Sequence, residues 1–175
     1  MELLQGEAFE DLFRTFERQA FHLEVQDSYH TPDELGPFQR FLAGESDDLS
    51  WHQPWLELVR SVTDGGRTID RVRVVSVPHG NYTRWGLTIA PRNIAAGEDI
   101  RWLPRHLISA DQLTPDDYWL FDDERVVFTV FAPDGRFVGG AVTTDPVIVT
   151  HCRTVRDRVW QLAIPHSQYV DSNDV

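Results

Sequence analysis

The sequence contains no lysine, because all 16 of its basic residues are arginines. This excludes Schiff-base chemistry, a phosphate-loop lysine and a catalytic lysine. The single cysteine, Cys152, excludes an internal disulfide and is consistent with a reducing cytoplasm, where we expect the protein to be located. No run of 18 apolar residues is present, so we predict no membrane span. The acidic N-terminal stretch MELLQGEAFEDLF has no basic segment followed by an apolar one, which argues against a secretory signal.

The common catalytic signatures are missing as well. The sequence has no Gly-rich phosphate loop, no nucleophile elbow, no HExxH motif and no paired cysteines at zinc spacing. Its seven histidines are scattered, and no two of them stand at ligand spacing. We therefore predict no metal site and no cofactor, and the sequence leans towards a protein that is not an enzyme.

Acidic residues outnumber basic ones by 28 to 16, which gives a net charge of −12 at pH 7. Such a chain repels phosphate backbones, so we expect no direct binding to nucleic acid. An acidic face would suit a basic protein partner, although ordinary solubility explains the same charge.

With 175 residues, 41% of them hydrophobic, the chain has the size and composition of one globular domain. Residues 71–77 (RVRVVSV) are rich in β-branched side chains and precede a proline, which is typical of a buried strand. Helical patterns lie on both sides of it, and a second strand at 99–103 follows after about one crossover length. We predict a single α/β domain over 1–175, with a mixed sheet and helices on both faces.

Before this strand, an apolar stripe predicts a helix over 7–19, and alternation predicts a half-buried strand over 20–26 with His22 on its exposed face. A short helix is predicted over 37–43. Another helix is predicted over 54–63, and Trp51 and Trp55 lie on either side of its start. Packing of the two tryptophans in the core is the favoured interpretation. The alternative is an aromatic cage for a cation.

Arg71 and Arg73 alternate with valines, so their guanidinium groups share one face of the central strand. If that face is covered, the two arginines need carboxylate partners. By position in the sequence, the nearest candidates are Asp70, Glu98 and Asp99. A helix beginning at an Asn81 cap should then be broken or kinked at Pro91.

The clearest pattern lies over 118–143, where three strand-like runs are separated by DDE and APDG turn signals. It predicts an antiparallel meander. Asp145 and Pro146 should then cap and begin a long helix, with Cys152 on its buried stripe. Residues 166–175 are predicted to form a polar tail.

One group of polar residues follows the predicted strands, and sites in open α/β sheets gather beyond the carboxyl ends of the strands. Together these side chains would bind an anion or perform acid–base chemistry. The alternative is a surface ion-pair network. The candidate residues are His79, Tyr82, Arg84, Arg105, His106 and Asp122.

Four segments carry a resemblance to a known family: RVRVVSVPHGNYTRWGL, AGEDIRWLPR, DYWLFDDERVVFTVF and RDRVWQLAIPHSQY. Over nearly its whole length the chain resembles the uncharacterised actinobacterial family called domain of unknown function 6879. That family has no assigned activity. Its members are often encoded near helix-turn-helix regulators and small partner proteins, so the resemblance implies a role in regulation, such as one in development or in a toxin–antitoxin-like pair.

The order of elements also resembles one half of a phospholipase D-like fold. The catalytic motif of that superfamily needs a histidine and a lysine two residues apart, and this chain has no lysine. If the fold is that one, the phosphodiesterase chemistry is absent or rebuilt.

Three hypotheses follow. The leading one is a non-enzymatic cytoplasmic regulatory or interaction protein that partners a helix-turn-helix regulator or another small acidic or basic protein. The second is an anion- or nucleotide-binding domain, or a degenerate phosphodiesterase, with its site at the strand ends. The third is a structural dimer module.

Overall fold

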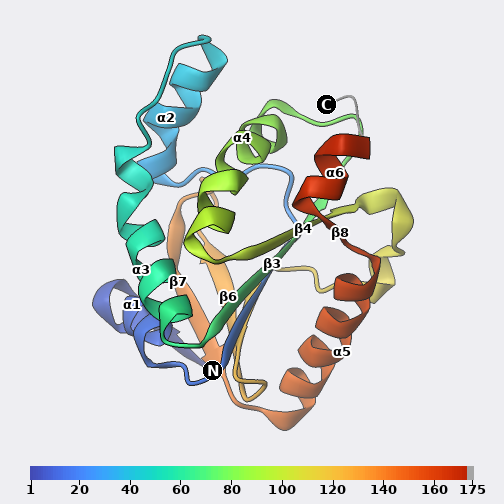
Figure 1. The fold of residues 1–175 in the computed structure, drawn as a ribbon. Helices are drawn as coiled ribbons and strands as arrows, with labels where there is room; N and C mark the ends of the chain where they lie inside the picture. Colours follow the sequence, from blue (N-terminus) through green and yellow to red (C-terminus); the bar gives the residue numbers. More distant parts are fainter. Residues whose placement is uncertain (173–175) are drawn as a thin grey trace.

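Strand β3 (Thr68–Val75) lies inside an eight-stranded mixed sheet in the computed structural model, which describes residues 1–172 (Figure 1). The strands stand in the order β1-β7-β6-β5-β2-β3-β4-β8. The other strands are β1 (Glu2–Leu4), β2 (Gln19–Glu24), β4 (Asp99–Pro104), β5 (Tyr118–Phe121), β6 (Arg125–Phe131), β7 (Phe137–Thr143) and β8 (Ile164–Pro165). The predicted α/β domain with a central valine-rich strand is confirmed.

The sheet is mixed because its two halves are connected differently. Strands β2, β3 and β4 pair in parallel through helical crossovers, whereas β5, β6 and β7 form the predicted antiparallel meander. The turn between β5 and β6 contains Asp122 and Asp123, both with positive φ, as tight hairpins require. β5 then pairs antiparallel to β2 and joins the two halves.

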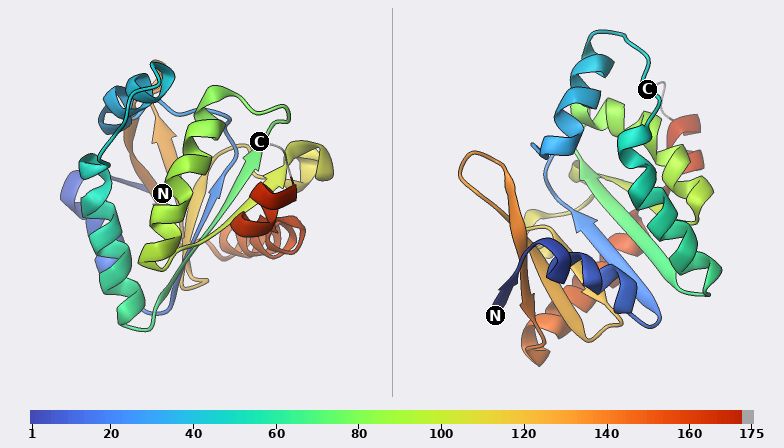
Figure 2. Two further views of the ribbon diagram at one scale, coloured as in Figure 1. Left: turned by 45° about the horizontal axis from the view of Figure 1, so that its top comes forward. Right: turned by 90° about the vertical axis from the view of Figure 1, so that its left-hand side faces the viewer.

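Helices cover both faces of the sheet, as predicted (Figures 1 and 2). α5 packs against one face, and α1, α3 and α4 pack against the other. The helices are α1 (Gly6–Thr15), α2 (Pro32–Leu42), α3 (Gln53–Asp64), α4 (Asn81–Ala96), α5 (Pro146–Leu162) and α6 (His166–Ser172), with short 3-10 turns η1 (Ser50–His52), η2 (Arg105–Leu107) and η3 (Ala110–Gln112).

The long helix α5 begins as the sequence predicts. The Asp145 side chain accepts hydrogen bonds from the backbone N–H groups of Val147 and Ile148, and Pro146 is the first helical residue. Cys152 is fully buried in the core on this face, and burial raises the pKa of its thiol to about 11. The thiol is therefore a packing group and is protonated at neutral pH.

Several expectations are corrected by the structure. α4 is continuous through Pro91, because buried residues on both sides of the proline anchor the helix to its neighbours. Its N-cap is Gly80, and Asn81 is already helical. α2 begins five residues before the predicted helix at 37–43.

The chain end also differs from the predicted polar tail. Residues 166–172 form α6, whose Tyr169 is 1% exposed and stacks on Trp102 at a ring-centroid distance of 5.8 Å. The tail's last three positions, 173–175, lie outside the described residues. Among residues 1–172, no helix has the length and apolar character needed to cross a membrane.

Candidate functional site

A cavity of about 600 Å³ lies between the sheet and the helices α1, α2, α3 and α4; we call it the central cavity. Its volume is within the range of natural small-molecule sites. Eight of its lining residues are aromatic, and they come from six different elements of the fold. The aromatic lining residues are Phe9, Phe13, Trp51, Trp55, Tyr82, Trp85, Trp119 and Phe137.

The floor of the central cavity is formed by neighbouring strands. His22 on β2 stands opposite Arg71 on β3, and Glu24 stands opposite Arg73. Because side chains alternate along a strand, these four side chains share the face beneath the helices, while the intervening apolar residues meet α5. This overturns the prediction that His22 is exposed: it is 9% exposed, because this face of β2 is covered too.

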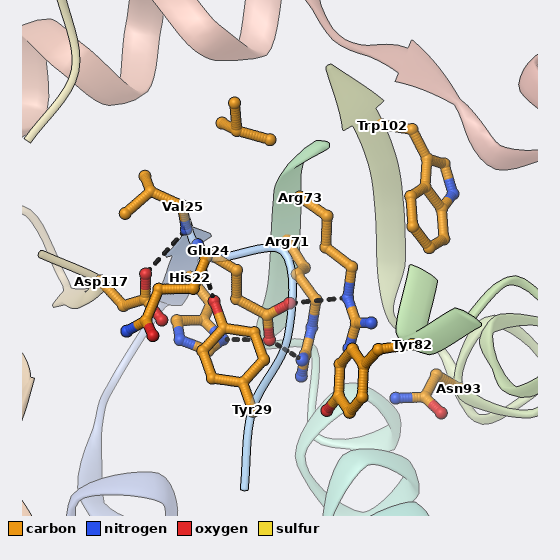
Figure 3. Close-up of polar contacts among 12 residues, drawn as sticks. His22, Glu24, Val25, Tyr29, Arg71, Arg73, Tyr82, Asn93, Trp102 and Asp117 are labelled. Carbon is orange, nitrogen blue, oxygen red and sulfur yellow. Dashed lines mark hydrogen bonds and ion pairs between the residues drawn. The ribbon is translucent and has the colours of Figure 1, made fainter. Parts of the chain in front are cut away.

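The charged floor residues are paired with one another (Figure 3). Arg71 Nη1 lies 2.6 Å from Glu24 Oε1, and Arg71 Nε lies 2.6 Å from Glu98 Oε1. Arg73 Nε lies 2.6 Å from Glu24 Oε2 and forms an ion pair with it, but the angle at the N–H group is unsuitable for a hydrogen bond. Two guanidiniums and two carboxylates therefore balance each other.

Of the three candidate partners for the arginines, only Glu98 pairs with one of them. Asp70 instead accepts a hydrogen bond from Gln19, and Asp99 contacts Arg101. Glu24 was missed because it lies 47 residues before Arg71 in the chain. Burial opposes ionisation of Glu24, but Arg73 and Arg71 outweigh it and lower the pKa of this carboxyl to about 2, so it stays charged.

The second oxygen of Glu98 is also satisfied. It accepts hydrogen bonds from Asn93 Nδ2 at 2.7 Å and from Trp55 Nε1 at 3.3 Å. Because Asn93 uses its nitrogen as the donor, its oxygen accepts, and His52 donates Nε2–H to it over 2.6 Å. Burial lowers the pKa of His52, which favours this neutral form.

His22 stacks flat on Trp119, with ring centroids 4.0 Å apart and 10° between the planes. Burial lowers the pKa of His22 to about 3, so the imidazole is neutral at pH 7. Neither ring nitrogen makes a hydrogen bond within residues 1–172; Nδ1 is 3.4 Å from Glu24 Oε1 and poorly aligned with it.

Three further side-chain atoms are buried without a hydrogen-bond partner in the described chain: Thr31 Oγ1, Trp51 Nε1 and Thr129 Oγ1. All three residues line the central cavity, as His22 does. A buried polar atom that lacks a partner costs about 1–3 kcal/mol, so such atoms are few in native proteins. Their concentration around one cavity makes the central cavity the candidate functional site of the described chain.

Of the residues predicted to form a site, Tyr82 lines the central cavity, where its hydroxyl donates to Glu34 Oε2 over 2.6 Å. His79 lies elsewhere: its Nδ1 donates to the Ser76 carbonyl at 2.9 Å, and its Nε2 accepts from the Tyr169 hydroxyl at 2.9 Å. It thus fastens α6 to the chain after β3.

The other four predicted residues do not converge with Tyr82. Arg105 donates to the Val25 carbonyl at 2.6 Å, and Arg84 and His106 are exposed. Asp122 follows β5, which runs antiparallel to β2, so it lies near the amino-terminal ends of β2 and β3, away from Tyr82. There its carboxylate accepts hydrogen bonds from the backbone N–H groups that lead into β2, at Glu17, Arg18 and Gln19. Within residues 1–172, no group of three potential metal-ligating side chains is found.

The chain was compared with family models, solved structures and curated proteins. A family model described as domain of unknown function 6879 matches residues 7–171. Among solved structures, NucT from Helicobacter pylori matches with a TM-score of 0.49 and 9% identity over 89% of each chain. A comparison with curated proteins finds no match.

Proposed function

This chain belongs to the family described as domain of unknown function 6879, and we propose that it is a cytoplasmic domain that binds a small molecule in the central cavity. One observation carries the proposal: His22, Thr31, Trp51 and Thr129 line the same cavity, and each has a buried polar atom without a partner among residues 1–172. Walls of apolar and aromatic side chains with a few convergent polar groups are typical of ligand sites.

The electrostatics of the floor favour binding over acid–base catalysis. An effective general acid or base has a pKa near the working pH. His22 has a pKa of about 3 and Glu24 one of about 2, and both are held by stacking or ion pairs. Around pH 7, His22 therefore stays neutral and Glu24 stays ionised, so neither group exchanges a proton with a substrate.

Thermal unfolding in the presence of small probes tests this function. The probes are the four ribonucleosides, indole, tetramethylammonium and inorganic phosphate, each at about 1 mM, and binding to the native state raises the melting temperature. Ile89 lines the cavity, so Ile89→Trp should fill it and abolish the shift. Arg92→Trp, at an exposed position of the same helix, should keep the shift. If no probe shifts the wild type, or if Ile89→Trp responds equally, the proposed function is wrong.

We propose further that the ligand-binding domain acts in regulation and contacts a basic partner, such as a helix-turn-helix regulator. Support comes from the net charge of −12, which complements a basic DNA-binding protein. The test is co-purification, at low salt, with a helix-turn-helix regulator from the same organism. A complex that dissociates as salt rises is expected, because attraction between opposite charges is screened. Absence of any complex at low salt would count against this partner.

A further inference from the structure

We infer that the ligand of the central cavity is an uncharged, planar heteroaromatic molecule of the nucleobase or nucleoside class. This inference rests on the proposed function and names the class of ligand for the same site. It follows from the charge, the aromatic surface and the hydrogen-bonding atoms of the residues that line the cavity.

The first argument is the balance of charge in the floor. The positive charges of Arg71 and Arg73 are matched by Glu24 and Glu98 at contacts of 2.6 Å. His22, between β2 and Trp119, is uncharged at neutral pH. A charged ligand would lose water at the floor without finding an unmatched opposite charge there, which is unfavourable.

The charges at the side of the cavity disfavour anions in particular. Arg14 is already engaged by Glu10 and Asp11, its neighbours on α1. Asp33 and Glu34, at the start of α2, add two carboxylates to the lining. With an overall charge of −12, this wall repels a phosphate group. A nucleotide is therefore a poorer ligand than the matching nucleoside.

The second argument is the shape of the aromatic wall. Trp51 and Trp85 are nearly parallel, with 24° between their planes and centroids 5.7 Å apart. Trp119 and His22 form a second flat pair at 4.0 Å. Flat surfaces of this kind favour stacking of planar rings, and bases stack well on aromatic side chains.

The third argument is the kind of polar atom that lacks a partner. Trp51 Nε1–H only donates, whereas the hydroxyls of Thr31 and Thr129 both donate and accept. Neutral His22 offers one donor and one acceptor. A molecule that satisfies this set needs both donors and acceptors on its edge, as nucleobases have. Tetramethylammonium, the type of cation favoured by aromatic cages, forms no hydrogen bonds and would leave all four residues unsatisfied.

Calorimetric titration of the full chain with the four ribonucleosides, and with the 5′-monophosphate of the tightest binder, tests the inference. We expect saturable binding of at least one nucleoside and at least tenfold weaker binding of its monophosphate. Affinity for the nucleoside should stay within about twofold between pH 6 and 8, because the floor groups keep their charge over that range.

The matched control separates failure of the inference from failure of the proposed function. If tetramethylammonium, phosphate or indole binds in a way that Ile89→Trp abolishes, and no nucleoside binds, the assignment to nucleobases and nucleosides is wrong and the cavity is still a binding site. If the monophosphate binds as tightly as the nucleoside, the charge argument is overturned. If no probe binds at all, the proposed function fails together with the inference.

Discussion

The Nε atom of Arg71 lies 2.6 Å from Oε1 of Glu98, and the two side chains are only 10% and 0% exposed. This ion pair joins the central strand β3 to the residue that precedes β4, beneath the helices that line the central cavity. Because Glu98 also accepts from Asn93 and Trp55, the same carboxylate ties α3 and α4 to the sheet. The cavity floor is thus fixed by a charge network whose members come from separate parts of the chain.

Replacing Glu98 by Gln should therefore destabilise the protein strongly. The variant leaves Arg71 with one carboxylate instead of two, and a broken buried pair typically costs about 3–5 kcal/mol. Urea unfolding should show a loss of at least about 2 kcal/mol, since Glu24 still holds Arg71. Asp99→Asn, at the exposed neighbour, should change stability by less than about 0.5 kcal/mol. Equal effects of the two variants would show that the network contributes little.

Thr129→Val should keep or raise the stability of the ligand-free protein. Its hydroxyl is buried without a partner among residues 1–172, so removing it relieves a desolvation cost of about 1 kcal/mol. Thr63→Val is the matched control, because that hydroxyl donates to the Val59 carbonyl and lies within hydrogen-bonding distance of the Ala96 carbonyl. The control should lose about 1 kcal/mol. A loss in Thr129→Val as large as in the control would mean that its hydroxyl is satisfied.

The contribution of Asp117 to the free energy of unfolding should fall as pH rises from about 4 to 6. Burial raises the pKa of this carboxyl from 3.8 to about 6, so the folded protein holds a proton that the unfolded chain has released. The full effect is about 3 kcal/mol at most. Asp117→Asn keeps an acceptor for the Val25 N–H, which lies 2.7 Å from the carboxylate, and removes the titration. The stability difference between wild type and this variant should change over pH 4–6 and be constant above pH 7; a difference independent of pH would contradict the assignment.

Tyr82→Phe should test whether the Tyr82–Glu34 hydrogen bond shapes the cavity wall. The variant keeps the ring and loses a 2.6 Å hydrogen bond to a carboxylate. Bonds to charged groups contribute about 1.5–3 kcal/mol, and partial exposure of Glu34 places the expected loss near the lower value. Fluorescence-monitored unfolding measures it. A loss no greater than that of an exposed control such as Thr154→Val would show that the bond is not formed in solution.

The sequence predicted the parts of the fold that local signals determine. Asp145 and Pro146 mark the start of α5, and the turn residues after Phe131 mark the meander. No local signal in the sequence gives the direction of β5. Asp122 was therefore predicted at the carboxyl ends of the parallel strands, whereas it lies at their amino-terminal ends.

The site was harder to predict, because its floor depends on contacts between distant segments. Alternation in β2 is typical of a half-buried strand and gave no sign that helices cover its polar face as well. The arginines at 71 and 73 were the usable signal: two cations on a buried strand require carboxylates, and Glu24 alternates with apolar residues in the strand next to them.

The most direct test of the central claim is calorimetric titration of Trp51→Phe with the nucleoside that the wild type binds best. This variant keeps an aromatic ring at the cavity wall and removes the unpartnered N–H. Trp160→Phe, on α5 at the other face of the sheet, is the matched control. We predict that Trp51→Phe weakens the affinity at least fivefold while Trp160→Phe leaves it unchanged. Equal affinities in wild type and Trp51→Phe, or no saturable heat with the wild type, would contradict the account.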